Sequence, residues 1–241
     1  MKKKKFIKKK KNIKVIIKEQ NKENVKILEI GPGMAPQYER SIKIDANPIY
    51  GKSNKTLKKS GFNYVPIELD INVDNIPFPN DYFDLICMRH IIEHVYYPRI
   101  LDFLKEANRV LRVGGKLQIV CPNLEAAAKA YCRGDIEWFL GVERGSRKRG
   151  ERGINLTDVN GPNTQTIGER FMKLLISGGS DTYVIARRLN DPKTKQLGGL
   201  AHQWGYDFEQ LSKLSDLAGF KKIARTDNKN ARLELKVEMY K

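Results

Sequence analysis

Acidic residues and glycines follow three short apolar runs in the first 71 residues, where they could hold a nucleotide. In chain order these residues are Glu29, Gly31, Pro32, Gly33, Asp45 and Asp70. A glycine turn lets the backbone approach a ligand closely, and a carboxylate leaving the neighbouring strand can accept both hydroxyls of a ribose. The spacing therefore predicts a site for an adenosine-containing cofactor at the carboxyl ends of parallel strands.

Two other nucleotide-binding motifs contain a similar glycine turn, and the sequence excludes both. The dinucleotide fingerprint needs a small residue where this chain has Pro36. About eight residues separate Gly33 from the next strand, too few for a crossover helix of ~10–12 residues. A phosphate-binding P-loop is also excluded, because no Gly-Lys-Ser or Gly-Lys-Thr follows the turn. What remains is the pattern acid-x-Gly-x-Gly.

This pattern resembles motif I of the class I (Rossmann-like) methyltransferases that use S-adenosylmethionine (SAM), with Ala35 where that family often has a third glycine. Later segments resemble further landmarks of the family in the right order. Residues 76–88 resemble its proline-bearing loop and fourth strand, and 89–95 resemble the start of the next helix. The resemblance covers most of 25–225, tightly in the cofactor half and loosely in the second half. It implies a SAM-dependent methyltransferase.

The implied fold class is α/β, a three-layer Rossmann-like structure with a seven-stranded, mostly parallel sheet. The last strands, 220–225 and 233–240, are expected to form an antiparallel C-terminal hairpin. We predict that Gly114-Gly115 caps the helix before the fifth strand. We predict that residues 1–18 form a basic, disordered tail and that the methyltransferase domain spans 19–241. Within this domain, 124–201 is predicted to be an inserted lid that recognises the substrate.

The resemblance also implies which residues hold SAM, which would leave as S-adenosyl-L-homocysteine. Asp45 is expected at the ribose, Asp70 at the adenine edge, and Glu29 with the glycine turn at the methionine part. The full set of implied cofactor contacts is Glu29, Gly31, Pro32, Gly33, Asp45, Ala46, Asp70, Ile71 and Arg89.

Residues 202–207, His-Gln-Trp-Gly-Tyr-Asp, resemble a box found in the branch of the family that modifies cell-surface glycans and small molecules. The acceptor would be an oxygen or nitrogen of such a compound, aligned for in-line displacement. A hydroxyl acceptor must lose a proton near neutral pH, a task suited to histidine. We predict His202 as the base, His90 as a positioning residue and Tyr206 as an alternative base.

Two further patterns resemble known catalytic motifs, but neither stands where its mechanism needs it. His90, Glu93 and His94 spell the H-x-x-E-H pattern of some zinc proteases. They directly follow the fourth strand of a nucleotide-binding pattern, so we expect no metal. Asn47-Pro48-Ile49-Tyr50 resembles a box that positions a planar amino nitrogen, but it follows the second strand instead of the fourth.

The composition indicates a cytoplasmic enzyme. No apolar run approaches the ~20 residues needed to cross a bilayer, and Cys87, Cys121 and Cys132 lack the spacing of metal ligands. The net charge is +17, but ten of the lysines lie within residues 1–18. Such a tail is either a solvated segment or one attracted weakly to RNA or to an anionic inner membrane surface. The arginines of 144–152 could hold an anionic group of the acceptor.

Two other functions remain open at this point. An RNA or protein methyltransferase would use the basic tail and lid to bind its substrate. A non-catalytic SAM-binding partner subunit would bind the cofactor without turnover. The sequence indicates neither the acceptor nor the oligomeric state.

Deleting residues 1–18 tests the interpretation of the tail. We expect the shortened protein to keep its thermal stability and its SAM affinity, because no motif uses the ten lysines. Any attachment of the full chain to anionic vesicles or RNA should weaken steeply with salt and disappear on deletion. A shortened protein that fails to fold would show that the tail is a structural segment.

Overall fold

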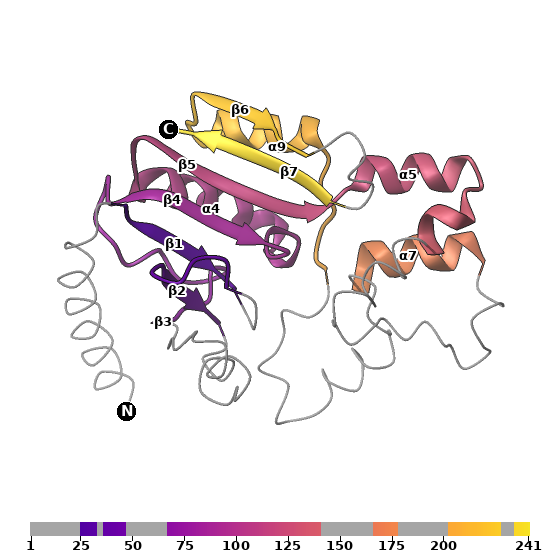
Figure 1. Ribbon diagram of the computed structural model, residues 1–241, viewed down its shortest axis with the longest axis horizontal. Helices are drawn as coiled ribbons and strands as arrows, with labels where there is room; N and C mark the ends of the chain where they lie inside the picture. Colours follow the sequence, from indigo (N-terminus) through magenta and orange to yellow (C-terminus); the bar gives the residue numbers. More distant parts are fainter. Residues whose placement is uncertain (1–24, 33–35, 47–66, 141–165, 178–201, 228–233) are drawn as a thin grey trace.

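Seven strands form one sheet in the order β3-β2-β1-β4-β5-β7-β6 (Figure 1). The computed structural model describes residues 25–32, 36–46, 67–140, 166–177, 202–227 and 234–241. The strands are β1 (Ile27–Ile30), β2 (Ile42–Asp45), β3 (Ile67–Glu68), β4 (Phe83–Arg89), β5 (Leu111–Pro122), β6 (Lys222–Arg225) and β7 (Glu234–Tyr240). The first five strands run parallel to one another, whereas β7 is antiparallel to both β5 and β6. The expected Rossmann-like sheet with an antiparallel C-terminal hairpin is confirmed.

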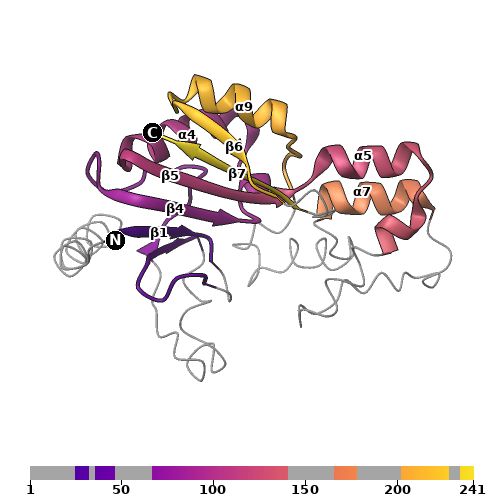
Figure 2. The same ribbon diagram turned by 45° about the horizontal axis from the view of Figure 1, so that its top comes forward.

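One face of the sheet is apolar and is covered by α4 (Tyr97–Val110) and α9 (Phe208–Leu217), as Figure 2 shows. Four buried side chains lie in register across β1, β4, β5 and β7 on this face. They are Leu28, Ile86, Leu117 and Met239. Helix α4 presents apolar residues at helical spacing to them, including Phe103 and Leu104. The main core therefore lies between the sheet and these two helices.

The opposite face carries a polar row across the same strands. In register order its members are Lys43, Glu29, Cys87, Gln118 and Glu238. Within the described residues, no helix covers this face, so the predicted third layer stays a prediction. The predicted tail, 1–18, and Asn47-Pro48-Ile49-Tyr50 lie outside the described residues. No helix in the described part of the chain is long and apolar enough to cross a membrane.

The predicted glycine cap of α4 is wrong. The helix ends at Val110, and Leu111 already has extended backbone. Gly114 and Gly115 instead lie within β5, where the pairing with β4 shifts register between Phe83 and Leu85. A Cβ on Gly115 would lie 2.9–3.1 Å from three backbone oxygens, so only glycine fits this irregularity. The two glycines therefore mark an irregularity in β5 and not the end of α4.

Helices α5 (Leu124–Cys132) and α7 (Ile167–Ser177) project beyond the carboxyl ends of the strands (Figure 1). They share a small core of their own, in which Trp138 and Phe139 are buried and Tyr131 stacks on Phe171. Asn123 caps α5 by accepting a hydrogen bond from the backbone of Ala126 at 3.1 Å. These helices belong to the predicted lid. Its remaining parts, 141–165 with the basic patch 144–152, and 178–201, lie outside the described residues.

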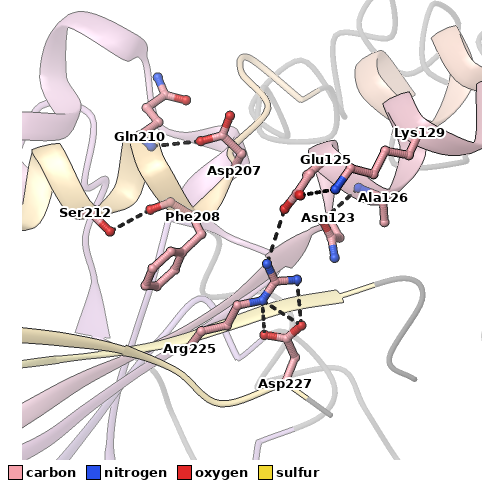
Figure 3. A network of polar contacts seen from close by, with 10 residues as sticks. All are labelled: Asn123, Glu125, Ala126, Lys129, Asp207, Phe208, Gln210, Ser212, Arg225 and Asp227. Carbon is pink, nitrogen blue, oxygen red and sulfur yellow. Dashed lines mark hydrogen bonds and ion pairs between the residues drawn. The ribbon is translucent and has the colours of Figure 1, made fainter. Parts of the chain in front are cut away.

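An ion-pair network attaches α5 to the C-terminal hairpin (Figure 3). Arg225 of β6 donates to both carboxylate oxygens of Asp227 and to Glu125 of α5 at 3.3 Å. The same Glu125 pairs with Lys129 one turn along α5. Asp207 caps α9 by accepting from the backbone of Gln210 at 2.8 Å. The hairpin thereby helps to fix where α5 leaves the sheet.

The connection from β1 to β2 is closed by a buried ion pair instead of a crossover helix. The carboxylate of Glu29 accepts from the backbone N–H groups of Gln37 (2.6 Å) and Tyr38 (2.9 Å) and from the Ser41 hydroxyl. Lys43 lies 3.8 Å from Glu29 and donates to the carbonyls of Tyr38 and Ser41. Both charged side chains are almost fully buried. Burial lowers the pKa of Lys43, an effect that the Glu29 carboxylate opposes.

Changing Lys43 to Met should destabilise the protein strongly. The substitution leaves the Glu29 carboxylate and several carbonyls buried without their cation, which costs about 3–5 kcal/mol in comparable pairs. Denaturant unfolding measures the change. The matched control is Lys116→Met, which breaks a partly exposed pair with Glu238 on the same face and should cost ~1 kcal/mol or less. Equal losses in the two variants would contradict this role for Lys43.

Candidate active site

Backbone hydrogen bonds bring the predicted cofactor residues together at the carboxyl edge of the sheet. The N–H of Gly31 donates to the carbonyl of Ile44 at 2.8 Å, and the N–H of Leu69 donates to the carbonyl of Asp45 at 2.9 Å. The glycine turn, Asp45 and the segment that begins at Asp70 are therefore neighbours. This confirms the expected convergence of three strand ends, although Gly33 lies outside the described residues.

Gly31 is required by both its backbone and its surroundings. Its φ of +60° lies in the left-handed region. A Cβ atom there would stand 2.2 Å from Cδ1 of Ile91, in the segment that follows β4. The glycine turn therefore packs directly against the start of the next element. Pro32 beside it is half-buried, and Ala46 after β2 is exposed.

Asp70 and its neighbours link the cofactor edge to η1, a short helical turn over Ile92–His94. A carboxylate oxygen of Asp70 accepts from the N–H of Asn72 at 2.9 Å. The Asn72 side chain in turn donates to the carbonyl of His94 at 3.5 Å and accepts from the N–H of Tyr96 at 2.8 Å. The carbonyl of Ile71 accepts from Arg99 at 3.4 Å. The predicted adenine-binding segment is therefore tied to the residues that follow β4.

Two predicted cofactor residues have partners within the chain. Glu29 uses both carboxylate oxygens to close the β1–β2 connection, so its direct contact with a cofactor stays a prediction. Arg89, at the end of β4, lies 3.4 Å from a carboxylate oxygen of Glu234 and 3.5 Å from the side-chain oxygen of Gln37. Its cofactor contact also stays a prediction.

His90 lies between two carboxylates at the end of β4. Its Nε2 is 3.0 Å from Glu234, and its Nδ1 is 3.3 Å from Glu93. Burial alone would lower the pKa of His90, but the carboxylates of Glu234 and Glu93 raise it to about 9. Its φ of +52° is uncommon for a residue other than glycine and marks a tight turn out of the strand. His90 is therefore cationic near neutral pH, which suits the predicted positioning role.

His202 and Tyr206 are both buried behind this edge. The His202 side chain is 6% exposed, its Nε2 lies 3.9 Å from Glu93, and its ring donates to the backbone carbonyl of Leu175. Burial lowers the pKa of His202 to about 4. The Tyr206 hydroxyl has no hydrogen-bond partner among the described residues, and burial raises its pKa. In this geometry neither group faces outward, so their predicted roles as a base stay predictions.

Glu93 and Trp204 also lie at this site, although neither is predicted from the sequence to act there. Glu93 is 1% exposed, and its backbone carbonyl accepts from the N–H groups of Gln203 (2.6 Å) and Trp204 (3.2 Å). These bonds hold the segment before α9 against η1. The signals in the sequence were the H-x-x-E-H pattern for Glu93 and the box at 202–207 for Trp204. His90 faces Glu93 and Glu234, whereas the ring of His94 packs against that of His202.

Residues 29–119 match the sequence profile of the family described as "Methyltransferase domain". The match spans the three strand ends, β4 and most of β5. These residues are therefore similar to a methyltransferase domain. SAM as the cofactor is what the resemblance of the glycine turn and its neighbouring segments to the class I family implies.

Similar proteins place the domain in context. An uncharacterized protein of Methanocaldococcus jannaschii is 30% identical over 120 residues. The aligned segment covers 50% of this chain and 51% of that protein, so the chain spans about half the length of this curated relative. A SAM-dependent methyltransferase of Aquifex aeolicus is 14% identical, over 90% of this chain and 82% of that one, with a TM-score of 0.44. A SAM-dependent methyltransferase of Archaeoglobus fulgidus is 12% identical, over 95% of this chain and 94% of that one, with a TM-score of 0.46. The likeness to a methyltransferase domain rests on the sequence match over 29–119.

The residues present at the edge fit the cofactor of a methyltransferase domain. Asp45 and Asp70 leave adjacent strands, where carboxylates suit ribose hydroxyls and the adenine amino group. The left-handed backbone of Gly31 turns the chain sharply beside them. SAM supplies an activated methyl group when bound. The chain supplies the hydrogen-bonding groups that hold and orient it.

Changing Asp45 to Ala should weaken SAM binding while the fold stays intact. The expected loss is ~1.5–3 kcal/mol, the usual scale for a hydrogen bond to a charged group. Calorimetric titration with SAM measures the affinity, and circular dichroism checks the fold. The matched control is Asp102→Ala, an exposed carboxylate on α4 that should leave the affinity unchanged. Unchanged binding by Asp45→Ala would remove this residue from the site.

Proposed function

We propose that this protein transfers the methyl group of SAM to an oxygen or nitrogen of a small-molecule or glycan-type acceptor. The observation that carries the proposal is an open aromatic groove beside the cofactor edge of the methyltransferase domain. Methyl transfer needs the acceptor atom in line with the sulfur–methyl bond and water excluded. A groove adjoining the strand ends gives an acceptor such a position.

The groove is formed where α4 begins and where the chain enters α9. The rings of Tyr97 and Trp204 stack with centroids 4.3 Å apart and an interplanar angle of 27°. Both residues are more than two-fifths exposed, and Tyr96 beside them is half exposed. Together with Arg99 and Gln203 they line an open hollow of about 610 Å³.

Exposed aromatic faces favour an acceptor with a ring. Stacked aromatic side chains can pack against the C–H face of a sugar or against a planar ring. Arg99 is held in place by the carbonyls of Ile71 and Asp74 and by the side chain of Asn75, which fixes one wall of the groove. Asn72 and Tyr96 connect this wall to the cofactor edge. The proposed acceptor ring would therefore lie next to the proposed SAM site.

A hydroxyl acceptor would also need help in losing its proton. All three histidines of the chain, His90, His94 and His202, lie together around Glu93 behind the groove. We assign activation of the acceptor to this group as a whole rather than to His202 alone, because the Nε2 of His202 faces Glu93. The proposed histidine-assisted step thus includes the predicted base His202, with His90 positioned by two carboxylates.

The acceptor can be found by following labelled methyl groups from SAM into separate pools of metabolites, glycans, RNA and protein. We expect label in the metabolite or glycan pool. Trp204→Ala should then raise KM for that acceptor about tenfold, the effect of losing an aromatic contact worth about 1.4 kcal/mol. SAM affinity should stay unchanged. Trp204→Phe, which keeps a ring, should lie close to the wild type.

Other outcomes decide between the remaining functions. Label in RNA or protein would replace the proposed acceptor class. Binding of SAM without transfer to any pool would support a non-catalytic partner subunit. An unchanged KM in Trp204→Ala would show that the aromatic groove does not hold the acceptor.

A further inference from the structure

Glu93 is a buried carboxylate with no hydrogen-bond partner. Its side chain is 1% exposed, and neither oxygen accepts a hydrogen bond in the described part of the chain. Nδ1 of His90 lies 3.3 Å away, but without the geometry of a hydrogen bond. A buried carboxylate is costly unless cations and donors surround it, and the ion-pair partners described for the side chain of Glu93 are the rings of His90 and His202. The surroundings of Glu93 therefore need an explanation.

Two imidazoles converge on this carboxylate from different parts of the chain. One ligand atom each from Glu93, His94 and His202 lies within 4.8 Å of the others. Nitrogen and oxygen donors on a tetrahedral zinc ion lie about 3.4 Å apart, so side-chain rotations would have to bring these three atoms closer together. One carboxylate and two imidazoles are a donor set typical of zinc and neighbouring transition metals.

The outer contacts of His202 fit a metal ligand. Its ring donates a hydrogen bond to the backbone carbonyl of Leu175, while its Nε2 lies 3.9 Å from Glu93. Histidines that bind metals usually donate in this way to a carbonyl or carboxylate, which fixes the ring. The two backbone bonds from Gln203 and Trp204 to Glu93 hold the segment that carries His202 in place.

A small cavity adjoins two of the three residues, Glu93 and His202. It measures about 10 Å³ and is lined by Glu93, His202 and Tyr206, among others. The hydroxyl of Tyr206 is buried and, like Glu93, has no partner among the described residues. Two unpartnered polar groups on one cavity of this size are consistent with a site for a small polar species.

We propose that Glu93, His94 and His202 bind one divalent transition-metal cation, with zinc as the best match to the donors. This revises the sequence expectation of no metal, and it differs from the H-x-x-E-H arrangement because His90 is not in the set. A cation there would polarise an acceptor hydroxyl. That use rests on the proposed function, whereas the binding of the cation does not.

Titration of the full, untagged chain tests the proposal. After removal of metals with a chelator, Zn²⁺ is titrated by calorimetry, and Co²⁺ is followed by its visible absorption. We expect one equivalent of either cation per chain, with a Co²⁺ spectrum that indicates imidazole ligands. Glu93→Gln and His202→Ala each remove one proposed ligand, and the chain has only three histidines. Each variant should therefore bind the cation at least about 100-fold more weakly, a larger loss than is typical when a residue that supports a ligand is removed.

The matched control is His90→Ala, which removes an imidazole beside Glu93 but outside the proposed set and should keep wild-type Zn²⁺ affinity. Circular dichroism and SAM titration on the same samples check that each variant folds and holds its cofactor. If Glu93→Gln fails to fold, His202→Ala and His94→Ala decide. The proposal would be overturned if the wild type bound Zn²⁺ no more tightly than these variants. It would also be overturned if His90→Ala lost as much Zn²⁺ affinity as they do. Metal binding without methyl transfer would refute only the proposed function.

Discussion

The short connection between β1 and β2 depends on the buried Glu29–Lys43 pair. Parallel strands are usually joined by a helix that satisfies its own backbone, but only residues 31–41 are present here. The carboxylate of Glu29 therefore accepts from the backbone N–H groups of Gln37 and Tyr38, and Lys43 donates to the carbonyls of the same loop. The pair lets the chain return to the sheet at once. That return sets Asp45 beside the glycine turn.

This arrangement gives the acid of motif I a structural role. A carboxylate at the carboxyl end of a strand could serve a ligand or the backbone, and Glu29 serves the backbone through both oxygens. The remaining acids at this edge, Asp45 and Asp70, follow β2 and β3. The carbonyl of Asp45 accepts from the N–H of Leu69, and the carboxylate of Asp70 accepts from the N–H of Asn72. The two acids lie toward one end of the edge, and the aromatic groove follows the end of β4.

The elements that follow β4 connect these two parts. Ile91 packs on Gly31, Asn72 bonds to η1, and the carbonyl of Glu93 holds the chain before α9. The same few residues therefore place the glycine turn, the histidines and Trp204 relative to one another. The carboxylate of Glu93 lies at the centre of this arrangement, buried and without a hydrogen bond from any described residue. It differs in this from Glu234, whose pKa is lowered to about 2 mainly by its hydrogen bond to His90.

The sequence by itself determined the sheet, its strand ends and the likeness of 29–119 to a methyltransferase domain, because these follow from local patterns. Apolar runs of fixed length, a glycine turn and acids at strand ends are readable one segment at a time. It misplaced the role of Gly114-Gly115, since a register shift depends on which backbone oxygens of β4 approach. Only the tertiary structure decided that Glu93, His94 and His202 meet and that Trp204 stacks on Tyr97. These contacts join segments about 110 residues apart, and the backbone bonds that bring them together leave no periodic signal in the sequence.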